Sequence, residues 1–356
     1  MSAGHRQEST PLFLRNAWYV AAWKDEVVEG SLFARTLLEE PVVLFRQSSG
    51  AVAALEDRCR HRFAPLSRGR LEGDRLRCMY HGLVYDASGA CVEIPGQDHI
   101  SARACVRSYP IVERDRYVWI WMGDVALANP DLIPDCHWQA DPAWRCKPGY
   151  KYFAADYRLI VDNLLDFSHL SFVHANTLGG SNSMATLRPK IETFDWGLRI
   201  TRLYPSDMMP PYAAALASYT SPVDRWQIYD WHIAGNVLSM DSGFARAGAG
   251  ALEGKRPDDA FQFHSIQALT PETASTTHYF WTYPHNFALD DPAVTDMLAN
   301  GISNAFEEDR VMIMAQQDVL NRSPDLAMFN IGADAAPMQV RARLDQLLAA
   351  EATGLT

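Results

Sequence analysis

The stretch from Pro41 to Trp121 is a series of short apolar runs separated by turn residues. The runs are rich in β-branched and aromatic side chains, a pattern typical of strands joined by tight turns. They are PVVLFR, AVAALE, LVYDASGACVEI and YVWIW. The pattern predicts an antiparallel β domain.

Beyond residue 130 the spacing of apolar positions changes. Helix-like spacing occurs at 162–174 and 302–319, and the alternating segments LRITRLY, RWQIYDWHI and THYFWTY predict strands of a further sheet. We therefore expect an α+β chain, with an N-terminal antiparallel β domain over 1–130. The second domain, over 131–356, is expected to hold an antiparallel sheet flanked by helices. Within it, the Ala/Gly-rich piece Gly243 to Asp259 is expected to be a mobile loop.

Composition narrows the functional classes. The 356 residues exceed a typical single core, which agrees with two domains. A formal net charge of -11 argues against a nucleic-acid partner, because phosphate binding needs clustered Lys and Arg. No apolar run resembles a signal peptide or approaches the length of a membrane span, so we expect a cytoplasmic protein that does not bind membranes.

Two short motifs between residues 59 and 82 carry cysteine and histidine. Cys59 and His61 stand in CRHRF, and Cys78 and His81 stand in CMYHG. Two thiolates on one iron and two imidazoles on the other are the ligands of a Rieske 2Fe-2S cluster. A structural zinc site is the alternative, but Cys2His2 zinc motifs usually place both cysteines before both histidines. The remaining cysteines are expected to be small buried hydrophobes: Cys91, Cys105, Cys136 and Cys146.

A second pair of histidines lies in VDNLLDFSHLSFVH. His169 and His174 are five residues apart, about 140° around an ideal helix. They can meet at one metal only if the helix is distorted, and we expect the distortion near Ser171 to Val173. Alone, two histidines on an arbitrary helix are more often ordinary core or surface histidines than metal ligands. Asp166 could hold an imidazole N–H from outside the metal site, or could be a surface charge.

Asp309 is the acid that the pattern places in the interior. On a helix it lies within an apolar stripe, whereas Glu307, Glu308 and Arg310 fall outside. The stripe comprises Ile302, Ala305, Phe306, Met312, Ile313 and Gln316. A buried carboxylate is costly unless it is paired or bound to a metal. Two imidazoles and one carboxylate form the ligand triad of non-haem Fe(II) oxygenases, which leaves positions for O2.

The chain resembles the oxygenase components of Rieske non-haem iron oxygenases, and it is similar to the branch of vanillate O-demethylase and p-toluenesulfonate methyl-monooxygenase. The segments that carry the resemblance span both domains: RNAWYVAAW, AVAALED, CVEIPGQ, YVWIWMGD, VDNLLDFSHLSFVH, VDRWQIY, LTPET, HNFALDD and AFEEDR. The resemblance implies that His169, His174 and Asp309 bind a mononuclear Fe(II), with Asn163 beside it. It also implies that the four cysteine and histidine residues bind the Rieske cluster.

The resemblance also implies partners. Asp166 would bridge His81, on the cluster of one subunit, to the iron histidine His169 of the next in a head-to-tail homotrimer. NADH, flavin and a plant-type 2Fe-2S domain are expected on a separate reductase, since their motifs are absent from this sequence. The implied reaction is hydroxylation of a methyl or methoxy group of a small aromatic acid. A ring-hydroxylating dioxygenase and a non-catalytic Rieske electron carrier are the alternatives.

The substrate pocket is expected between the strands before the last helix and the 205–220 segment. Candidate polar contacts lie on strand-like runs expected to face the iron: His232, Ser239, Gln267 and His285.

Overall fold

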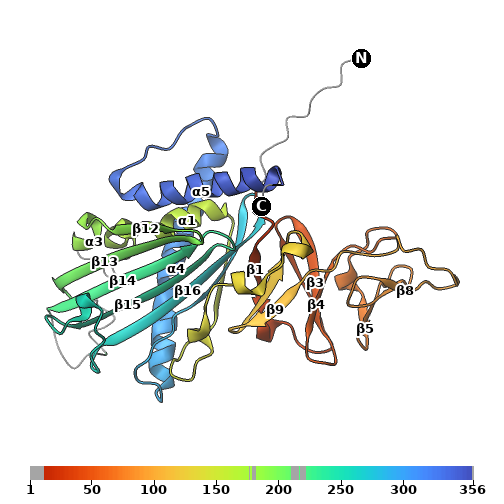
Figure 1. The fold of residues 1–356 in the computed structure, drawn as a ribbon, viewed down its shortest axis with the longest axis horizontal. Coiled ribbons are helices and arrows are strands. Elements are labelled where there is room, and N and C mark those ends of the chain that lie inside the picture. The colour runs from red at the N-terminus through yellow and green to blue at the C-terminus, as the bar shows by residue number, and fades with distance from the viewer. Residues whose placement is uncertain (1–11, 176, 179–181, 210–215, 217–221, 355–356) are drawn as a thin grey trace.

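Figure 1 shows the computed structural model, an elongated molecule with a strand-rich N-terminal end and a larger end in which helices accompany a broad sheet. The structure describes residues 12–175, 177–178, 182–209, 216 and 222–354. In these ranges no helix combines the length and the apolar character needed to cross a membrane.

The N-terminal end is built, over the described residues, from three small antiparallel sheets. The first has the order β1-β10-β9 and consists of β1 (Trp18–Trp23), β9 (Ile111–Arg114) and β10 (Tyr117–Trp121). The second consists of β2 (Leu32–Leu37), β3 (Glu40–Arg46) and β4 (Val52–Glu56). The third consists of β5 (Arg70–Glu72), β6 (Arg75–Arg77), β7 (Val84–Tyr85) and β8 (Cys91–Glu93). The predicted antiparallel β domain is confirmed.

The larger end contains an antiparallel sheet with seven strands in the described part of the chain, in the order β11-β17-β16-β15-β14-β13-β12. Neighbours in the run from β12 to β17 are consecutive in sequence, and β11 closes the edge against β17. The strands are β11 (Gly149–Phe153), β12 (Lys190–Phe194), β13 (Gly197–Asp207), β14 (Val223–His232), β15 (Val237–Arg246), β16 (Phe261–Thr273) and β17 (Thr276–Thr282). The three predicted strand segments lie in β13, β14 and β17.

Helices complete the predicted α+β architecture. They are α1 (Tyr157–Leu165), α2 (Leu170–Val173), α3 (Asn182–Thr186), α4 (Pro292–Arg322) and α5 (Ala335–Ala352). A continuous core of buried apolar side chains joins α1, α4 and α5 to the large sheet, and α1 contacts both α4 and α5. The predicted helix at 302–319 lies inside α4.

The apolar stripe predicted on α4 needs a correction. Met312 is 59% exposed and Gln316 is also exposed. Only a narrow face of α4 packs against the rest of the protein. Met312, three residues after Asp309, therefore already lies on the solvent side of the helix. The buried face runs through Ile302, Ala305, Phe306, Asp309, Ile313 and Gln317.

Two further expectations are wrong in part. Residues 243–246 of the predicted loop belong to β15, and Gly243 is needed there because a Cβ would lie 2.2 Å from the Phe261 carbonyl oxygen and 2.4 Å from the Trp226 indole. Among the cysteines expected to be buried, Cys136 is buried, but Cys105 is exposed and the other two are intermediate.

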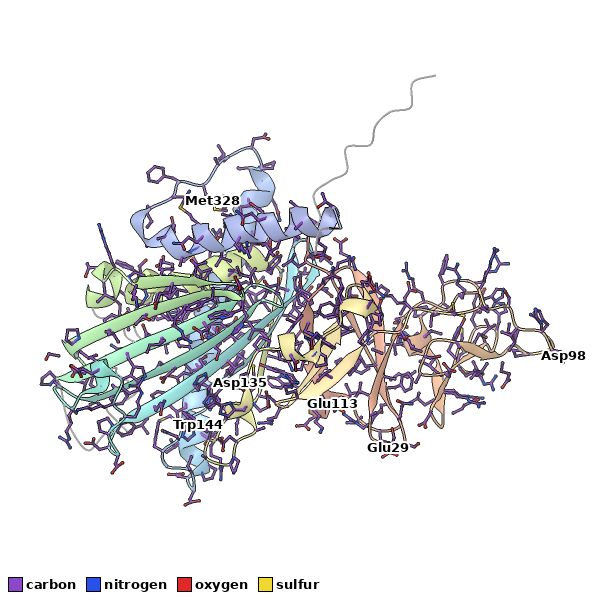
Figure 2. All side chains as sticks on the ribbon, viewed as in Figure 1. Glu29, Asp98, Glu113, Asp135, Trp144 and Met328 are labelled. Carbon is purple, nitrogen blue, oxygen red and sulfur yellow. The ribbon has the colours of Figure 1, made fainter. Side chains whose placement is uncertain are left out.

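The two ends share buried side chains. Trp18 and Trp119 of the N-terminal sheets pack with Val237, Ile266 and Phe280 of the large sheet. The boundary between residues 130 and 131 stays a prediction. Asp98, just after β8, marks the outer tip of the N-terminal end, and Trp144 lies at the large sheet (Figure 2). The tip that carries the Cys-His motifs is therefore remote from the large sheet within one chain.

Candidate metal centres

His169, His174 and Asp309 meet at one point, with their ligand atoms all within 4.8 Å of one another. The Asp309 Oδ1 atom lies 3.4 Å from His169 Nε2 and 3.2 Å from His174 Nε2. Asp309 is 5% exposed and His174 is 1% exposed. Within the described ranges this is the one group of three or more such side chains that converges in this way.

A break in the helix brings the two histidines together. α1 ends at Leu165, Asp166 has an extended backbone, and a 3-10 turn (Phe167–His169) leads into α2. The Asp166 carboxylate caps this turn by accepting hydrogen bonds from Ser168 N and Oγ, at 2.8 and 2.9 Å. The distortion predicted near Ser171 to Val173 is therefore misplaced, because that segment is helical and the chain turns before His169.

Hydrogen bonds fix both imidazole rings. The Nδ1 of His169 donates to the Asp166 carbonyl oxygen at 2.5 Å, and the Nδ1 of His174 donates to Glu308 Oε2 at 2.7 Å. Each ring therefore presents Nε2 to Asp309, as metal-binding histidines do when the other nitrogen is held. Within this chain the backbone of Asp166, rather than its carboxylate, holds an imidazole. Glu308 lies outside the predicted apolar stripe of α4, so that stripe does not predict its contact with His174.

Asn163 lies beside the three ligand residues, as expected. Its Nδ2 donates to Asp309 Oδ1 at 2.9 Å and lies 3.4 Å from His169 Nε2. Burial would raise the pKa of Asp309, but hydrogen bonds from both histidines outweigh it and hold that pKa well below its usual range. For His174, burial lowers the pKa, yet the hydrogen bonds and charges of Asp309 and Glu308 raise it overall. A buried carboxylate facing two oriented imidazoles is a donor set that fits a divalent iron.

The cysteine and histidine motifs form a second centre. Cys59 and Cys78 are buried, whereas His61 and His81 are exposed with ring centroids 4.4 Å apart. Burial raises the pKa of the Cys78 thiol. Among the described residues, no three of these four side chains form a group that converges on one metal position, as the four ligands of a tetrahedral zinc ion would. Inner thiols and outer imidazoles fit the two irons of a Rieske cluster.

A cavity of about 90 Å³ opens beside the three ligand residues. Apolar side chains supply one part of its lining: Phe167, Leu170, Met240, Tyr283, Ile302 and Phe306. Polar side chains of the sheet supply another: Arg225, Gln227, Ser242, Ser265 and Gln267.

Of the four substrate contacts expected from the sequence, only Gln267 lines the cavity. Ser239 lies on the opposite face of the sheet, bonded to His264 at 2.9 Å, because side chains alternate along β15 and Met240 takes the inner position. His232 stacks on Trp196, with ring centroids 4.7 Å apart.

His285 is bonded to the Phe287 carbonyl oxygen and to Thr295 Oγ1, outside the cavity lining. Most of the 205–220 segment, namely 210–215 and 217–220, lies outside the described residues. Apart from Gln267, the inward polar side chains of β14 to β16 were not predicted from the sequence: Arg225, Gln227, Ser242 and Ser265.

Comparisons with known proteins match both ends of the chain to described domain families. Residues 17–110 match the Rieske [2Fe-2S] domain, and residues 153–350 match the vanillate O-demethylase oxygenase C-terminal domain. The chain is 52% identical over 346 residues to the iron-sulfur subunit of a toluene-4-sulfonate monooxygenase system from Comamonas testosteroni, covering 96% of this chain and 99% of that one.

It is also 35% identical over 347 residues to a vanillate O-demethylase oxygenase subunit from Pseudomonas sp. (strain HR199), covering 96% of each chain. Among solved structures, dicamba monooxygenase bound to dicamba matches with a TM-score of 0.86 and 34% identity, covering 96% of this chain and 99% of that one. These similarities extend over nearly the whole chain.

Proposed function

Because the chain belongs to the family of oxygenase subunits that join a Rieske [2Fe-2S] domain to a vanillate O-demethylase oxygenase C-terminal domain, we propose that it is the oxygenase component of a multicomponent Rieske monooxygenase. Its substrate is a small aromatic acid, and it hydroxylates a methyl or methoxy group. The observation that carries the proposal is the convergence of His169, His174 and Asp309 at a largely apolar cavity.

We assign a mononuclear Fe(II) to these three residues and a Rieske cluster to Cys59, His61, Cys78 and His81. When bound, the ferrous ion would offer open coordination positions for O2, and the cluster would supply electrons. Glu308 and the Asp166 carbonyl oxygen orient the imidazoles, and Asn163 steadies the Asp309 carboxylate. The apolar lining displaces water around the reacting C–H bond.

The overall reaction consumes O2, two electrons and two protons. One oxygen atom enters a substrate C–H bond and the other leaves as water. From an aryl methyl group the product is a benzyl-type alcohol, whereas a hydroxylated methoxy group breaks down to formaldehyde and a phenol. The same site therefore serves both reactions.

The two centres belong to opposite ends of one chain: β5 and β8 mark the tip in Figure 1, and α4 lies with the large sheet. The exposed His61 and His81 are flanked by Phe63 and Tyr80, each 65% exposed. Next to the iron residues, Phe172, Val311 and Met312 line a hollow on the surface. These apolar surfaces support the head-to-tail homotrimer of the family, in which Asp166 faces His81 of the partner subunit.

Electrons are proposed to come from a separate reductase with flavin, NADH and a plant-type 2Fe-2S domain. The printed names of the relatives support a multicomponent system, since they describe an iron-sulfur subunit of a monooxygenase system and an oxygenase component. A cytoplasmic location is part of the same proposal.

Product analysis tests the function. The purified oxygenase with a reductase of this class is supplied with toluene-4-sulfonate, 4-methylbenzoate and vanillate. The expected products are benzyl-type alcohols or formaldehyde, formed in proportion to O2 consumed and absent from His169→Ala and Asp309→Ala. A cis-diol would instead identify a ring dioxygenase, and electron transfer with no oxygenated product would identify an electron carrier.

A further inference from the structure

Arg225 is the one lysine or arginine that lines the cavity among the described residues. It lies on β14, is 7% exposed, and comes from a chain with a net charge of -11. The overall field of the protein repels an anion, so an acidic substrate needs a local cation inside the site. Arg225 supplies that charge on the sheet side of the cavity.

Hydrogen bonds make the neighbouring polar side chains donors. The Gln227 Oε1 atom accepts from the Tyr204 hydroxyl at 3.1 Å, which leaves the amide N–H groups of Gln227 for other acceptors. Opposite Gln227 in the strand register stands Ser242, which also lines the cavity. Arg225 and Gln227 are two residues apart on β14, and Ser242 on the adjacent strand β15 pairs with Gln227. The three residues are therefore neighbours on the sheet.

Gln267 and Ser265 on β16, which also line the cavity, can donate hydrogen bonds as well. The Tyr279 hydroxyl donates to Gln267 Oε1, and Gln267 Nε2 donates to Ser265 Oγ at 3.0 Å. Because Ser265 Oγ already accepts, its own hydrogen is available to the cavity. Donors therefore follow the sheet from β14 to β16, and a carboxylate or sulfonate carries only acceptors.

We propose that Arg225, with Gln227 and Ser242, forms an oxyanion subsite that binds the sulfonate or carboxylate of the aromatic acid and directs the ring toward the iron residues. This rests on the proposed oxygenase function and specifies its substrate class. Arg225 is then a specificity-determining residue. Neutral methyl aromatics should bind without its help.

An ion pair with Asp207 is the competing role for Arg225. One guanidinium nitrogen, Nη1, lies 3.3 Å from Asp207 Oδ2. A guanidinium has five N–H donors, so this contact leaves donors for a ligand. Asp207→Asn separates the two roles: it should keep or strengthen binding of the anion, whereas a purely structural pair predicts the same loss as Arg225→Gln.

The experiment measures binding to the iron-loaded holoprotein by titration calorimetry, without turnover. The probes are toluene-4-sulfonate, 4-methylbenzoate and the neutral methyl 4-tolyl sulfone. Arg225→Gln should weaken both anions roughly 10- to 100-fold and change the sulfone less than about threefold, the range of a charge-assisted hydrogen bond. The matched control is Arg202→Gln, since Arg202 is 2% exposed on neighbouring β13 and does not line the cavity.

Equal weakening of anions and sulfone, equal losses in Arg202→Gln and Arg225→Gln, or a wild type with no preference for anions over the sulfone would overturn the subsite. If Arg225→Gln does not fold, Arg225→Lys replaces it, and an unchanged preference for anions over the sulfone overturns the subsite. Turnover is scored separately: anion binding that depends on Arg225 without any oxygenated product refutes the oxygenase function and leaves the subsite standing.

Discussion

Glu308 accepts a hydrogen bond from His174 Nδ1 at 2.7 Å, while Asp309, the next residue on α4, faces the other nitrogen of that ring at 3.2 Å. One turn of α4 thus supplies the proposed ligand Asp309 and also Glu308, which orients the second proposed ligand His174. Thr177 donates to the same Glu308 oxygen at 2.7 Å and holds it in place.

Replacing Glu308 by glutamine should weaken iron retention roughly 10- to 100-fold, because a partner of a metal-bound histidine sets its orientation and basicity. Iron content after dialysis against a chelator measures this, and the visible spectrum of the cluster should not change. Glu307→Gln is the matched control, since Glu307 pairs instead with Lys151 and Arg310. Equal iron loss in both variants contradicts the role of Glu308.

Asp166→Asn should leave both metal centres occupied and slow turnover. Asparagine can still cap the turn at Ser168, and the carbonyl oxygen that holds His169 remains. What is lost is the charge proposed to face His81 of the partner subunit. Stopped-flow oxidation of the reduced cluster should slow at least tenfold, and a wild-type rate would refute the bridging role.

Acid should destabilise the fold through His278. Burial lowers its pKa to about 4, and the neutral ring accepts from the Tyr150 hydroxyl at 2.8 Å and donates to the Thr36 carbonyl oxygen at 3.0 Å. In the unfolded chain this histidine is protonated below about pH 6.5. The stability that the neutral, buried ring contributes to the fold is therefore fully present above about pH 6.5 and is lost as the pH falls from about 6.5 to about 4. The loss amounts to about 2 kcal/mol at pH 5.

The measurement is the free energy of unfolding in urea at pH 8 and pH 5. His278→Gln should reduce the difference between the two values. His99→Gln, at an exposed position, should leave it unchanged. An unaltered difference in His278→Gln shows that the acid sensitivity arises elsewhere.

Two glycines should respond to alanine with opposite signs. A Cβ at Gly149 would lie 2.0 Å from the Trp281 indole, so Gly149→Ala should destabilise the sheet edge by about 1–3 kcal/mol. Gly301 stands within α4 with open space around its Cβ position, and Gly301→Ala should stabilise by about 0.5–1 kcal/mol. Thermal unfolding midpoints check both signs, and a shift in the same direction for both would contradict the packing described.

Features that depend on short sequence spacing or on periodicity could be predicted from the sequence. The buried position of Asp309 followed from an apolar stripe, and the two Cys-His motifs followed from local spacing. The helix break could not be placed, because it depends on how Asp166 caps Ser168. The inner wall was misassigned because β15 and β16 carry few residues that distinguish their faces, so Ser239 was assigned to the face that Met240 occupies. The role of Arg225 could not be predicted from the sequence, because only the strand register shows that Gln227 and Ser242 lie beside it.

The most direct test is iron and sulfide analysis of anaerobically purified protein, wild type beside Asp309→Ala. The account predicts about three iron atoms per chain in the wild type, and in the variant only the two of the cluster with an unchanged cluster spectrum. A wild type that holds only cluster iron and gains no turnover from added ferrous salt, or a variant that keeps the third iron, would contradict it.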